Sequence, residues 1–351
     1  MKKKVFFIIS HLKAGGSEKV FWILSQYFDK SIFEVYLVVL DSRETFYSRD
    51  LASVKIIDLN SPRASKSVVK LRNLIAKEKP FAVFTTGGHI NTLLALVSLF
   101  VKIPKLIGRE SNVMDIMTKL GGIKEKFWDK FLGITYNRFD IAICQSEEIQ
   151  KSLANHYNIA DRKLIVIPNP VLPMDIIKTP DHSKNKRIII VARLAIEKGI
   201  LRFLHVLSRL PEEYTLTIAG EGPMKTQVLK EIENLKLTDR VKLVGVVREI
   251  PKLIASHDLF VLPSVTEGFP NVVLESLAVG VPVVAFGVGG IRAMLKPGFN
   301  GTIIAQDDLG AFEKSVINAC NRKWDHSAIK ADVETRFGVQ KVVKHYEALL
   351  S

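Results

Sequence analysis

Two glutamates in the run PSVTEGFPNVVLES have the residue type and spacing that recognition of a sugar-bearing ligand would need. Glu267 lies at the end of a loop, and Glu275 follows eight residues later, inside a helix that we expect to begin near Asn271. The two carboxylates should then lie at different levels of one wall, where one reaches a sugar and the other a ribose. Spacing alone also fits an acid–base couple, whereas a core role is disfavoured for two acidic residues beside a glycine turn.

The backbone between these glutamates predicts an anion site. Gly268 and the N–H groups of Phe269, Asn271 and Val272 lie where the helix begins, and a helix start presents free N–H groups and a partial positive charge. Pro270 contributes rigidity but no donor. We therefore expect this turn to hold a phosphate or another anionic group.

A second loop, ARLAIEKG, supplies cations. Arg193 and Lys198 stand five residues apart after an expected strand. A guanidinium fork and an ammonium at the mouth of a parallel sheet suit a diphosphate, because its charge is spread over several oxygens. The alternative is that both are ordinary surface charges near a helix start.

A third loop, HLKAGGSEKV, joins the first apolar run to a helix that we expect to begin near Ser17. Gly15 and Gly16 permit a phosphate or sugar oxygen to approach the backbone closely, although a plain turn is the alternative. Because the full GxGxxG spacing of a dinucleotide fingerprint is missing, an enzyme that uses a nicotinamide cofactor is disfavoured.

Short apolar runs alternate with amphipathic stretches along the chain, which predicts βαβ units and mostly parallel sheets. The runs of the first half are 5–9, 35–40, 81–86, 105–108, 141–146 and 164–169, and those of the second half are 187–193, 214–220, 241–245, 259–264 and 281–286. A polar stretch at 174–187 is typical of a linker, so we expect two doubly wound domains with a ligand at the carboxyl ends of their strands. The stretch 339–350 has helical spacing.

Taken in order, several segments resemble glycosyltransferase family 4, a large family of retaining enzymes with the GT-B architecture. The segments are AGGSEKV, RESN at 109–112, IPNPV at 167–171, VARLAIEKG, IAGEGP at 218–223, HDLFVLPSVTEGFPNVVLES and GVPVVAFGVGG at 280–290. The resemblance implies an α/β fold of two Rossmann-like domains facing each other across a cleft. Residues 1–172, with a C-terminal helix at about 337–351, would form the acceptor side, and residues 173–336 the donor side.

The resemblance also implies roles for individual residues. Glu267 would lie beside the donor sugar and Glu275 would bind the ribose hydroxyls. Arg193 and Lys198 are similar to the basic pair that holds the donor diphosphate. Gly16 would contact the donor from the opposite domain, and the loop 246–250 lies where relatives contact the base.

One position departs from the family pattern. Relatives often carry a histidine in the loop that here reads GRESN, and the equivalent position holds Glu110. His89, in TTGGHINT after another expected strand, is the alternative side chain for contact with the donor sugar or acceptor. A purely structural role remains open for both residues.

Cleavage of a bond between a sugar and a diphosphate builds negative charge on the departing phosphate, which fixed cations and helix-start N–H groups stabilise. No Asp-x-Asp follows an expected strand, and Asp307 and Asp308 are expected to cap a helix. We therefore predict catalysis without a metal ion and without a cofactor other than the donor substrate.

The balance of charge predicts an acidic partner. The chain of 351 residues has a formal net charge of +14, and residues 1–175 contain 26 Lys and Arg against 17 Asp and Glu, a surplus of 9. Nucleic acid is disfavoured because no recurrent aromatic residues accompany the basic ones. Two cysteines without ligand spacing, Cys144 and Cys320, and the lack of a spanning apolar run indicate a cytoplasmic protein.

Two basic, partly apolar segments indicate where an anionic membrane would bind. One is the amphipathic stretch 61–79, and the other is 121–139, in which Phe127, Trp128, Phe131 and Leu132 stand among lysines. A solvated helix packed by its apolar face is the alternative for the first. We expect attachment at the inner face of a bacterial membrane, with a lipid-linked saccharide as the acceptor.

Together these features predict a glycosyltransferase that moves a hexose or N-acetylhexosamine from a UDP-sugar during surface polysaccharide or glycolipid synthesis. A nucleotide-sugar epimerase of the same architecture and a non-catalytic nucleotide-sugar binding protein remain the alternatives. The spacing of Glu267 and Glu275, together with the partner loop ARLAIEKG, argues against the epimerase.

Overall fold

A computed structural model describes the chain except for residues 1, 62–63, 111–132, 134 and 180–185. The chain divides into two compact units, Met1–Pro170 with Val339–Ser351 and Val171–Gly338. These divisions lie two residues from those expected at 172/173 and 336/337. The chain enters the second unit at Val171 and leaves it after Gly338. These two crossing points are neighbours, because the N–H of Val171 donates to the carbonyl of Phe337 over 2.8 Å.

The first unit contains a parallel sheet of seven strands in the order β3-β2-β1-β4-β5-β6-β7. The strands are β1 (Lys3–Leu12), β2 (Phe33–Thr45), β3 (Lys55–Asp58), β4 (Ala82–Thr86), β5 (Lys105–Glu110), β6 (Ile141–Cys144) and β7 (Leu164–Val166). Its helices include α1 (Gly16–Tyr27), α2 (Ala64–Glu78), α3 (Gly88–Val97), α6 (Glu147–Tyr157) and α14 (Val339–Ala348). Every apolar run predicted as a strand in this half forms one, whereas β3 was not predicted.

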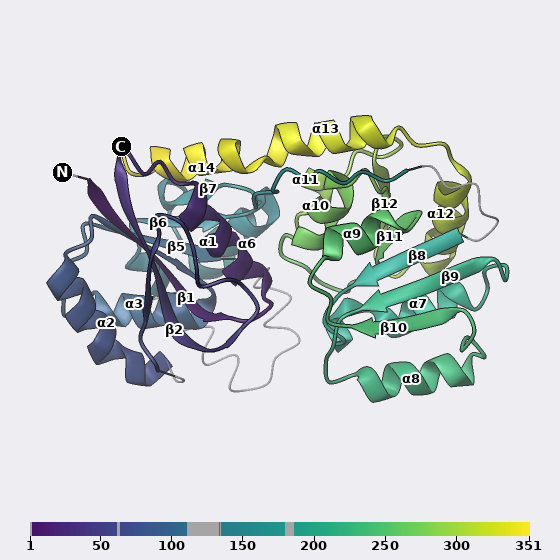
Figure 1. The fold of residues 1–351 in the computed structure, drawn as a ribbon, viewed down its shortest axis with the longest axis horizontal. Helices are drawn as coiled ribbons and strands as arrows, with labels where there is room; N and C mark the ends of the chain where they lie inside the picture. Colours follow the sequence, from purple (N-terminus) through teal and green to yellow (C-terminus); the bar gives the residue numbers. More distant parts are fainter. Residues whose placement is uncertain (1, 62–63, 111–132, 134, 180–185) are drawn as a thin grey trace. The chain divides into compact units, whose positions relative to one another are not determined.

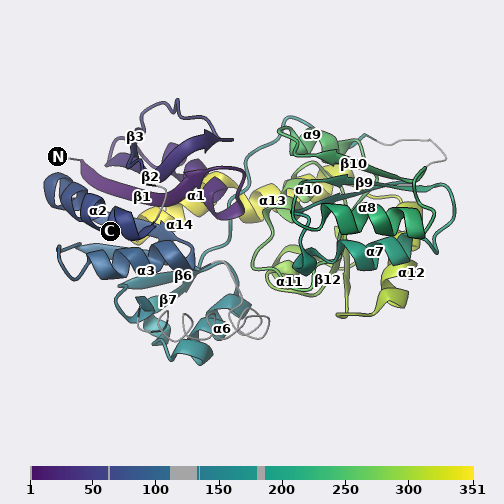
Figure 2. The ribbon, with the colours of Figure 1, turned by 90° about the horizontal axis from the view of Figure 1, so that it is seen from below.

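Helices cover both faces of this sheet, as continuous apolar strands require. On one face, Phe6 and Ile8 of β1 pack in the core that α2, α3 and α6 close. On the other, Phe7 packs at 5.2 Å from Phe21 of α1. Phe84 of β4 lies 5.7 Å from Tyr346 of α14 on that second face, so the last helix completes the first unit. Figure 1 shows α14 at the yellow end of the chain beside α1, and Figure 2 shows α2 beside α3.

The second unit contains a parallel sheet of six strands in the order β10-β9-β8-β11-β12-β13. The strands are β8 (Lys186–Val191), β9 (Tyr214–Ala219), β10 (Val241–Gly245), β11 (Leu259–Leu262), β12 (Val283–Phe286) and β13 (Gly301–Ile304). The helices are α7 (Ile200–Leu207), α8 (Lys225–Asn234), α9 (Ile250–Ala255), α10 (Asn271–Ala278), α11 (Ile291–Met294), α12 (Leu309–Asn321) and α13 (His326–Phe337). The short run that forms β13 was not predicted.

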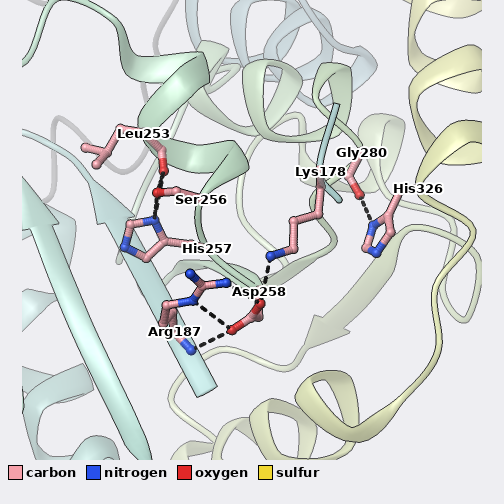
Figure 3. A network of polar contacts seen from close by, with 8 residues as sticks. All are labelled: Lys178, Arg187, Leu253, Ser256, His257, Asp258, Gly280 and His326. Atoms are coloured by element: carbon pink, nitrogen blue, oxygen red, sulfur yellow. Dashed lines mark hydrogen bonds and ion pairs between the residues drawn. The ribbon is translucent and has the colours of Figure 1, made fainter. Parts of the chain in front are cut away.

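A charged network closes the amino edge of the second sheet, where β8 and β11 begin (Figure 3). Asp258 accepts hydrogen bonds from Lys178 Nζ and from the backbone N–H of Arg187, each over 2.8 Å. Lys178 is buried to 4% side-chain exposure, so this ion pair fixes the incoming linker to the sheet. Ligands bind at the opposite, carboxyl edge of such sheets, so the network has a structural role.

Candidate functional site

Lys198 and Glu267 meet at the carboxyl edge of the second sheet. Lys198 Nζ lies 2.9 Å from both Glu267 Oε1 and Oε2, and Ser264 Oγ donates to Oε1 over 2.6 Å. The lysine follows β8 and the glutamate follows β11, which are neighbours at the point where the strand order reverses. This is the place where a doubly wound sheet binds ligands, so the structure brings two predicted residues together there.

A glycine and an arginine hold the Lys198 loop in place. Lys198 ends a short 3-10 helix, Ile196–Lys198, and Gly199 then takes the left-handed conformation with φ 63°. A Cβ at Gly199 would lie 1.9 Å from the carbonyl oxygen of Pro263, so the close approach of the two loops requires glycine. Arg202 Nη2 donates to the carbonyl of Ser264 over 2.5 Å, which ties the start of α7 to the same loop.

Arg193 does not join this contact. Its Nη2 pairs with Glu197 Oε1 at 2.6 Å, and 67% of its side chain is exposed. The predicted basic pair is therefore separated, with one cation at Glu267 and the other at Glu197. Exposure leaves Arg193 free to exchange its carboxylate partner for a phosphate, and its predicted role stays a prediction.

Glu275 lies on α10, which begins at Asn271 as expected from the sequence. Its carboxylate is buried to 6% residue exposure, on a helix whose neighbouring positions Leu274 and Leu277 belong to the core. A buried carboxylate is costly unless polar groups surround it. Its position about one turn into α10 fits the predicted contact with ribose hydroxyls, which remains a prediction.

The turn between the two glutamates packs against a pair of glycines, Gly289 and Gly290, that were not predicted as site residues. The N–H of Gly290 donates to the carbonyl of Gly268 over 2.7 Å. A Cβ at Gly289 would lie 2.2 Å from the carbonyl oxygen of Glu267, and one at Gly290 would lie 2.2 Å from the Phe269 ring. The run GVGG after β12 was the available signal, because repeated glycines mark close backbone approach.

Phe269, Asn271 and Val272 remain predicted donors of backbone N–H groups. The ring of Phe269 packs in the core of the second unit, 6.0 Å from the ring of Phe337. Residues of the predicted base-contacting loop, 246–250, follow β10, and Val246 is 58% exposed. Val246 is therefore accessible to a ligand, and the contact with the base stays a prediction.

Glu110 lies at the end of β5 inside a buried polar network of the first unit. Tyr136 donates a hydrogen bond to its carboxylate, and Asn91 Nδ2 donates to the Tyr136 oxygen over 2.9 Å. Burial, together with the Glu110 carboxylate, raises the pKa of Tyr136 well above its usual range. Glu110 itself is 1% exposed, so any role in contacting substrate would need this network to open to a ligand.

His89 is the second residue of α3 and is exposed. Crowding by protein atoms lowers the pKa of its imidazole, the Glu18 carboxylate acts in the opposite direction, and His11 adds to the decrease. Sequence reasoning missed His11 at the end of β1 and Glu18 in the first turn of α1, although both lie in the stretch HLKAGGSEKV that was singled out for its glycines. Gly16 begins α1, close to the position expected, and its contact with the donor remains a prediction.

The Glu18 carboxylate lies over the glycine turn that was expected to receive a phosphate or sugar oxygen. A Cβ at Gly15 would lie 2.4 Å from Glu18 Oε2. Ser10 Oγ donates to Glu18 Oε1 over 2.7 Å and holds the carboxylate there. Negative charge at this helix start disfavours a phosphate and leaves the sugar oxygen as the better of the two expected ligands.

Catalysis without a metal ion stays a prediction. Within the described ranges, no three His, Cys, Asp or Glu residues are arranged to hold a metal ion. Asp308 accepts a hydrogen bond from the N–H of Ala311 over 2.8 Å and caps α12, as predicted. Asp307 pairs with Arg202 at 2.7 Å.

The basic amphipathic stretch forms α2, whose apolar face is largely used by the core. Leu71 and Ile75 are buried, whereas Val69 is 63% exposed beside the exposed Lys70 and Arg72. The aromatic residues of the second predicted membrane segment, 127–132, lie outside the described residues. None of the helices that the structure describes is long and apolar enough to span a bilayer.

Comparisons with known proteins cover both units. The model of the family described as Glycosyltransferase Family 4 matches residues 14–173, and the model described as Glycosyl transferases group 1 matches residues 175–331. The chain is 26% identical to a Campylobacter jejuni protein over 81% of this chain and 80% of that one. That protein is named N-acetylgalactosamine-N,N'-diacetylbacillosaminyl-diphospho-undecaprenol 4-alpha-N-acetylgalactosaminyltransferase.

Two further similarities extend over most of the chain. An Escherichia coli UDP-Gal:alpha-D-GlcNAc-diphosphoundecaprenol alpha-1,3-galactosyltransferase is 23% identical over 74% of this chain and 71% of its own length. The crystal structure of Anabaena HepE in complex with UDP and glucose superposes with a TM-score of 0.81 at 19% identity, covering 99% of each chain. The fold therefore matches that of a protein crystallised with a nucleotide and a sugar.

Proposed function

This chain belongs to glycosyltransferase family 4 and has the two Rossmann-like units of the GT-B enzymes, and from that premise we propose that it transfers a hexose or N-acetylhexosamine from a UDP-sugar to a lipid-linked saccharide. The observation that carries the donor half of this proposal is the contact of Lys198 with Glu267 at the strand-order reversal of the second sheet. The HepE complex with UDP and glucose supports uracil as the base of the donor nucleotide.

The donor chemistry follows from the charges at this edge. When the bond between the anomeric carbon and the diphosphate oxygen breaks, negative charge grows on the diphosphate, and a nearby ammonium lowers the energy of that state. Lys198 is 23% exposed, so its Nζ can contact a ligand oxygen while Glu267 keeps it oriented. Arg193 exchanges Glu197 for the second phosphate, and Glu267 lies beside the sugar. Retention of anomeric configuration and independence from metal ions are part of the proposal.

The acceptor half of the proposal is supported by the relatives. Both the Campylobacter and the Escherichia coli proteins carry diphosphoundecaprenol-linked saccharides in their names. A lipid-linked acceptor requires the enzyme to work at a membrane surface. We assign the acceptor to the first unit, whose surplus of positive charge suits an anionic surface.

We assign the membrane contact to the exposed side of α2 and the end of α3, two helices that pack against each other. Lys66, Lys70, Arg72 and Lys77 are exposed along α2. Leu99 and Phe100, just after α3, are 59% and 61% exposed. Basic residues around exposed apolar side chains are typical of a peripheral contact with anionic lipid.

A sedimentation assay with vesicles tests this contact. The protein should bind vesicles that contain phosphatidylglycerol at low salt and should release them as salt screens the charges. Leu99→Ser with Phe100→Ser should weaken binding, whereas Leu229→Ser, which replaces a 44% exposed leucine on α8 of the second unit, should not. Equal retention on neutral vesicles, or none on anionic ones, would refute the membrane assignment.

Turnover with a panel of UDP-sugars tests the main proposal. UDP release should depend on one sugar and should rise when a lipid-linked saccharide is added, whereas an epimerase would change the sugar without releasing UDP. Lys198→Ala should lower kcat by about 100-fold or more, in the range seen when one stabilising donor is removed. Lys225→Ala, which removes an exposed lysine paired with Glu221, is the matched control and should keep full turnover.

A further inference from the structure

The first sheet has its own strand-order reversal, away from the donor residues just described. β1 lies between β2 and β4, and Ile8 of β1 is opposite Thr85 of β4. From β1 to β3 each new strand is added on one side of the sheet, and from β4 to β7 each is added on the other side. The loop after β1 leads to α1 on one face, and the loop after β4 leads to α3 on the other. Diverging loops of this kind open a crevice at the carboxyl edge.

Three titratable side chains converge at this reversal. His11 Nε2 lies 3.9 Å from Glu18 Oε1, and Ser10 Oγ donates to the same oxygen over 2.7 Å. His89 lies in the first turn of α3, directly after β4, the strand that pairs with β1, and the charges of Glu18 and His11 act on the pKa of its ring. His11 Nδ1 is buried without a hydrogen-bond partner among the described residues, which is the kind of atom that an ordered water or a ligand hydroxyl satisfies.

The chemistry of this group favours a neutral, hydroxyl-rich ligand over an anion. Imidazole nitrogens donate and accept, a carboxylate accepts, and a sugar hydroxyl does both. The Glu18 carboxylate occupies the start of α1, where a phosphate would otherwise bind, and repels it. Among the described residues, no three His, Cys, Asp or Glu side chains, His11, Glu18 and His89 included, are arranged to hold a metal ion.

An aromatic surface borders the same loop. Tyr47 Oη donates to the carbonyl of Gly15 over 3.1 Å, and the Tyr47 ring stacks on Trp22 at a centroid distance of 5.4 Å. Both rings are partly exposed. Amphipathic rings next to hydrogen-bonding groups provide the apolar face on which the C–H side of a sugar packs.

We propose that His11, Glu18 and His89 form a binding site for the hydroxyl groups of a saccharide, with Tyr47 and Trp22 as its apolar border. The inference rests on the proposed function, because it assigns the saccharide end of the acceptor, and not its diphosphate, to this edge. Glu18 has a double role: it accepts from a sugar hydroxyl and excludes phosphate from the glycine turn.

Nuclear magnetic resonance of the full chain tests this site without relying on activity. The imidazole C–H signals of His11 and His89 are assigned from His11→Gln and His89→Gln. Methyl hexosides and methyl N-acetylhexosaminides at about 50 mM, suited to weak millimolar binding, should shift both signals, and inorganic pyrophosphate should shift neither. Shifts caused by pyrophosphate in the unaltered protein, or no response to any saccharide, would overturn the site.

Removing the Glu18 charge should reverse this preference. In Glu18→Ala, the response to saccharide should fall at least about 5-fold and pyrophosphate should begin to shift the His89 signal. Glu18→Gln, which retains an oxygen that can accept from Ser10, covers the case in which the alanine variant does not fold. Glu44→Ala, which removes a 74% exposed carboxylate paired with Lys13, is the control and should leave both responses unchanged.

The donor proposal fails separately from this one. UDP binding is measured on the same samples by calorimetry, and Lys198→Ala should reduce it while leaving the histidine responses to saccharide intact. If the unaltered protein does not bind UDP but its histidine signals respond to saccharide, the donor proposal alone is overturned. UDP binding without any histidine response would overturn the saccharide site alone.

Discussion

Glu275 is the single residue whose loss should most directly remove donor recognition. Replacement by Gln keeps its size on α10 but removes the charge that would accept from two ribose hydroxyls, and hydrogen bonds to a charged group contribute about 1.5–3 kcal/mol each. We expect Glu275→Gln to weaken UDP affinity about 100-fold or more, and Glu275→Ala to abolish it, each with an unchanged circular dichroism spectrum. Calorimetric titration with UDP measures the effect.

The control for this substitution is an acidic residue of the same unit that has no predicted ligand contact. Glu233→Gln changes an exposed side chain on α8 and should leave UDP affinity as it was. If Glu275→Gln binds UDP as tightly as the unaltered protein does, the ribose assignment is wrong.

Sequence reasoning identified residue types and local turns better than it identified partners. The expected start of a helix at Asn271 is confirmed, because Pro270 and the apolar spacing after it determine that start locally. Spacing did not reveal that Arg193 pairs with Glu197 or that Lys198 reaches Glu267, 69 positions away. His11 and Glu18 escaped notice for the same reason, and their nearness to the predicted His89 could not be seen, since it depends on the pairing of β1 with β4.

Among the elements, the turn between the 3-10 helix and α7 has the strictest backbone requirement. Gly199→Ala combines a positive φ of 63° with a Cβ that would lie 1.9 Å from a carbonyl oxygen, so the loops that carry Lys198 and Glu267 must move apart. We expect the free energy of unfolding to fall by at least about 2 kcal/mol, and UDP affinity to fall with it. Urea unfolding followed by circular dichroism measures the first, and calorimetry the second.

A second glycine separates the effect of the positive φ from the effect of the Cβ contact. Gly298 also has a positive φ, 78°, but the nearest atom to its Cβ would lie 3.9 Å away. Gly298→Ala should therefore show the backbone strain alone, about 1 kcal/mol, with unchanged UDP affinity. Equal losses in the two variants would mean that the contact with Pro263 does not constrain the loop.

The amino edge of the second sheet predicts how stability depends on pH. Burial of Asp258 acts to raise its pKa, but hydrogen bonds from Lys178 and Arg187 outweigh it, so the pKa lies below the usual range of aspartate. A carboxyl whose folded pKa is lowered stabilises the fold above its unfolded pKa, and this contribution is lost as the pH falls through the folded value. The loss should therefore be seen below about pH 4.

Asp258→Asn tests that contribution. The variant should lose about 1–3 kcal/mol of unfolding free energy at pH 7, and the difference from the unaltered protein should shrink towards pH 3. Asp239→Asn, on an exposed turn before β10, should change neither quantity. A difference that stays constant from pH 7 to pH 3 would show that the Asp258 charge is not what stabilises this edge.

Most strands were predictable because long apolar runs in a parallel sheet are buried on both faces. β3 and β13 were missed because KIID and GTII are short and contain polar residues, and edge positions relieve them of full burial. The helix at the C-terminus was predictable from its spacing, but the unit to which it belongs was expected only from the family resemblance. Its packing against Phe84 supplies the physical reason.

At the scale of the whole molecule, that helix means that the chain returns to the unit in which it began. Tyr346 of α14 is fully buried, Lys3 Nζ donates to the carbonyl of Leu350 over 2.8 Å, and Lys105 Nζ donates to that of Leu349 over 3.0 Å. The first unit should therefore depend on the last residues of the chain, whereas the donor residues of the second unit should not. This separation allows stability and donor binding to be perturbed independently.

Tyr346→Ala should expose that separation. Removing a buried aromatic side chain costs about 3–5 kcal/mol, so the first unit should unfold at lower temperature or urea concentration while the second unit keeps its own transition. UDP affinity should remain within about 3-fold of normal, because the residues predicted to contact the ribose, base and diphosphate of UDP lie in the second unit. His345→Ala, which changes an exposed neighbour on α14, should leave both transitions in place. Calorimetric scans with and without UDP distinguish the outcomes: if UDP raises the temperature of the transition that Tyr346→Ala lowers, the donor site depends on the first unit and its assignment to the second alone is wrong.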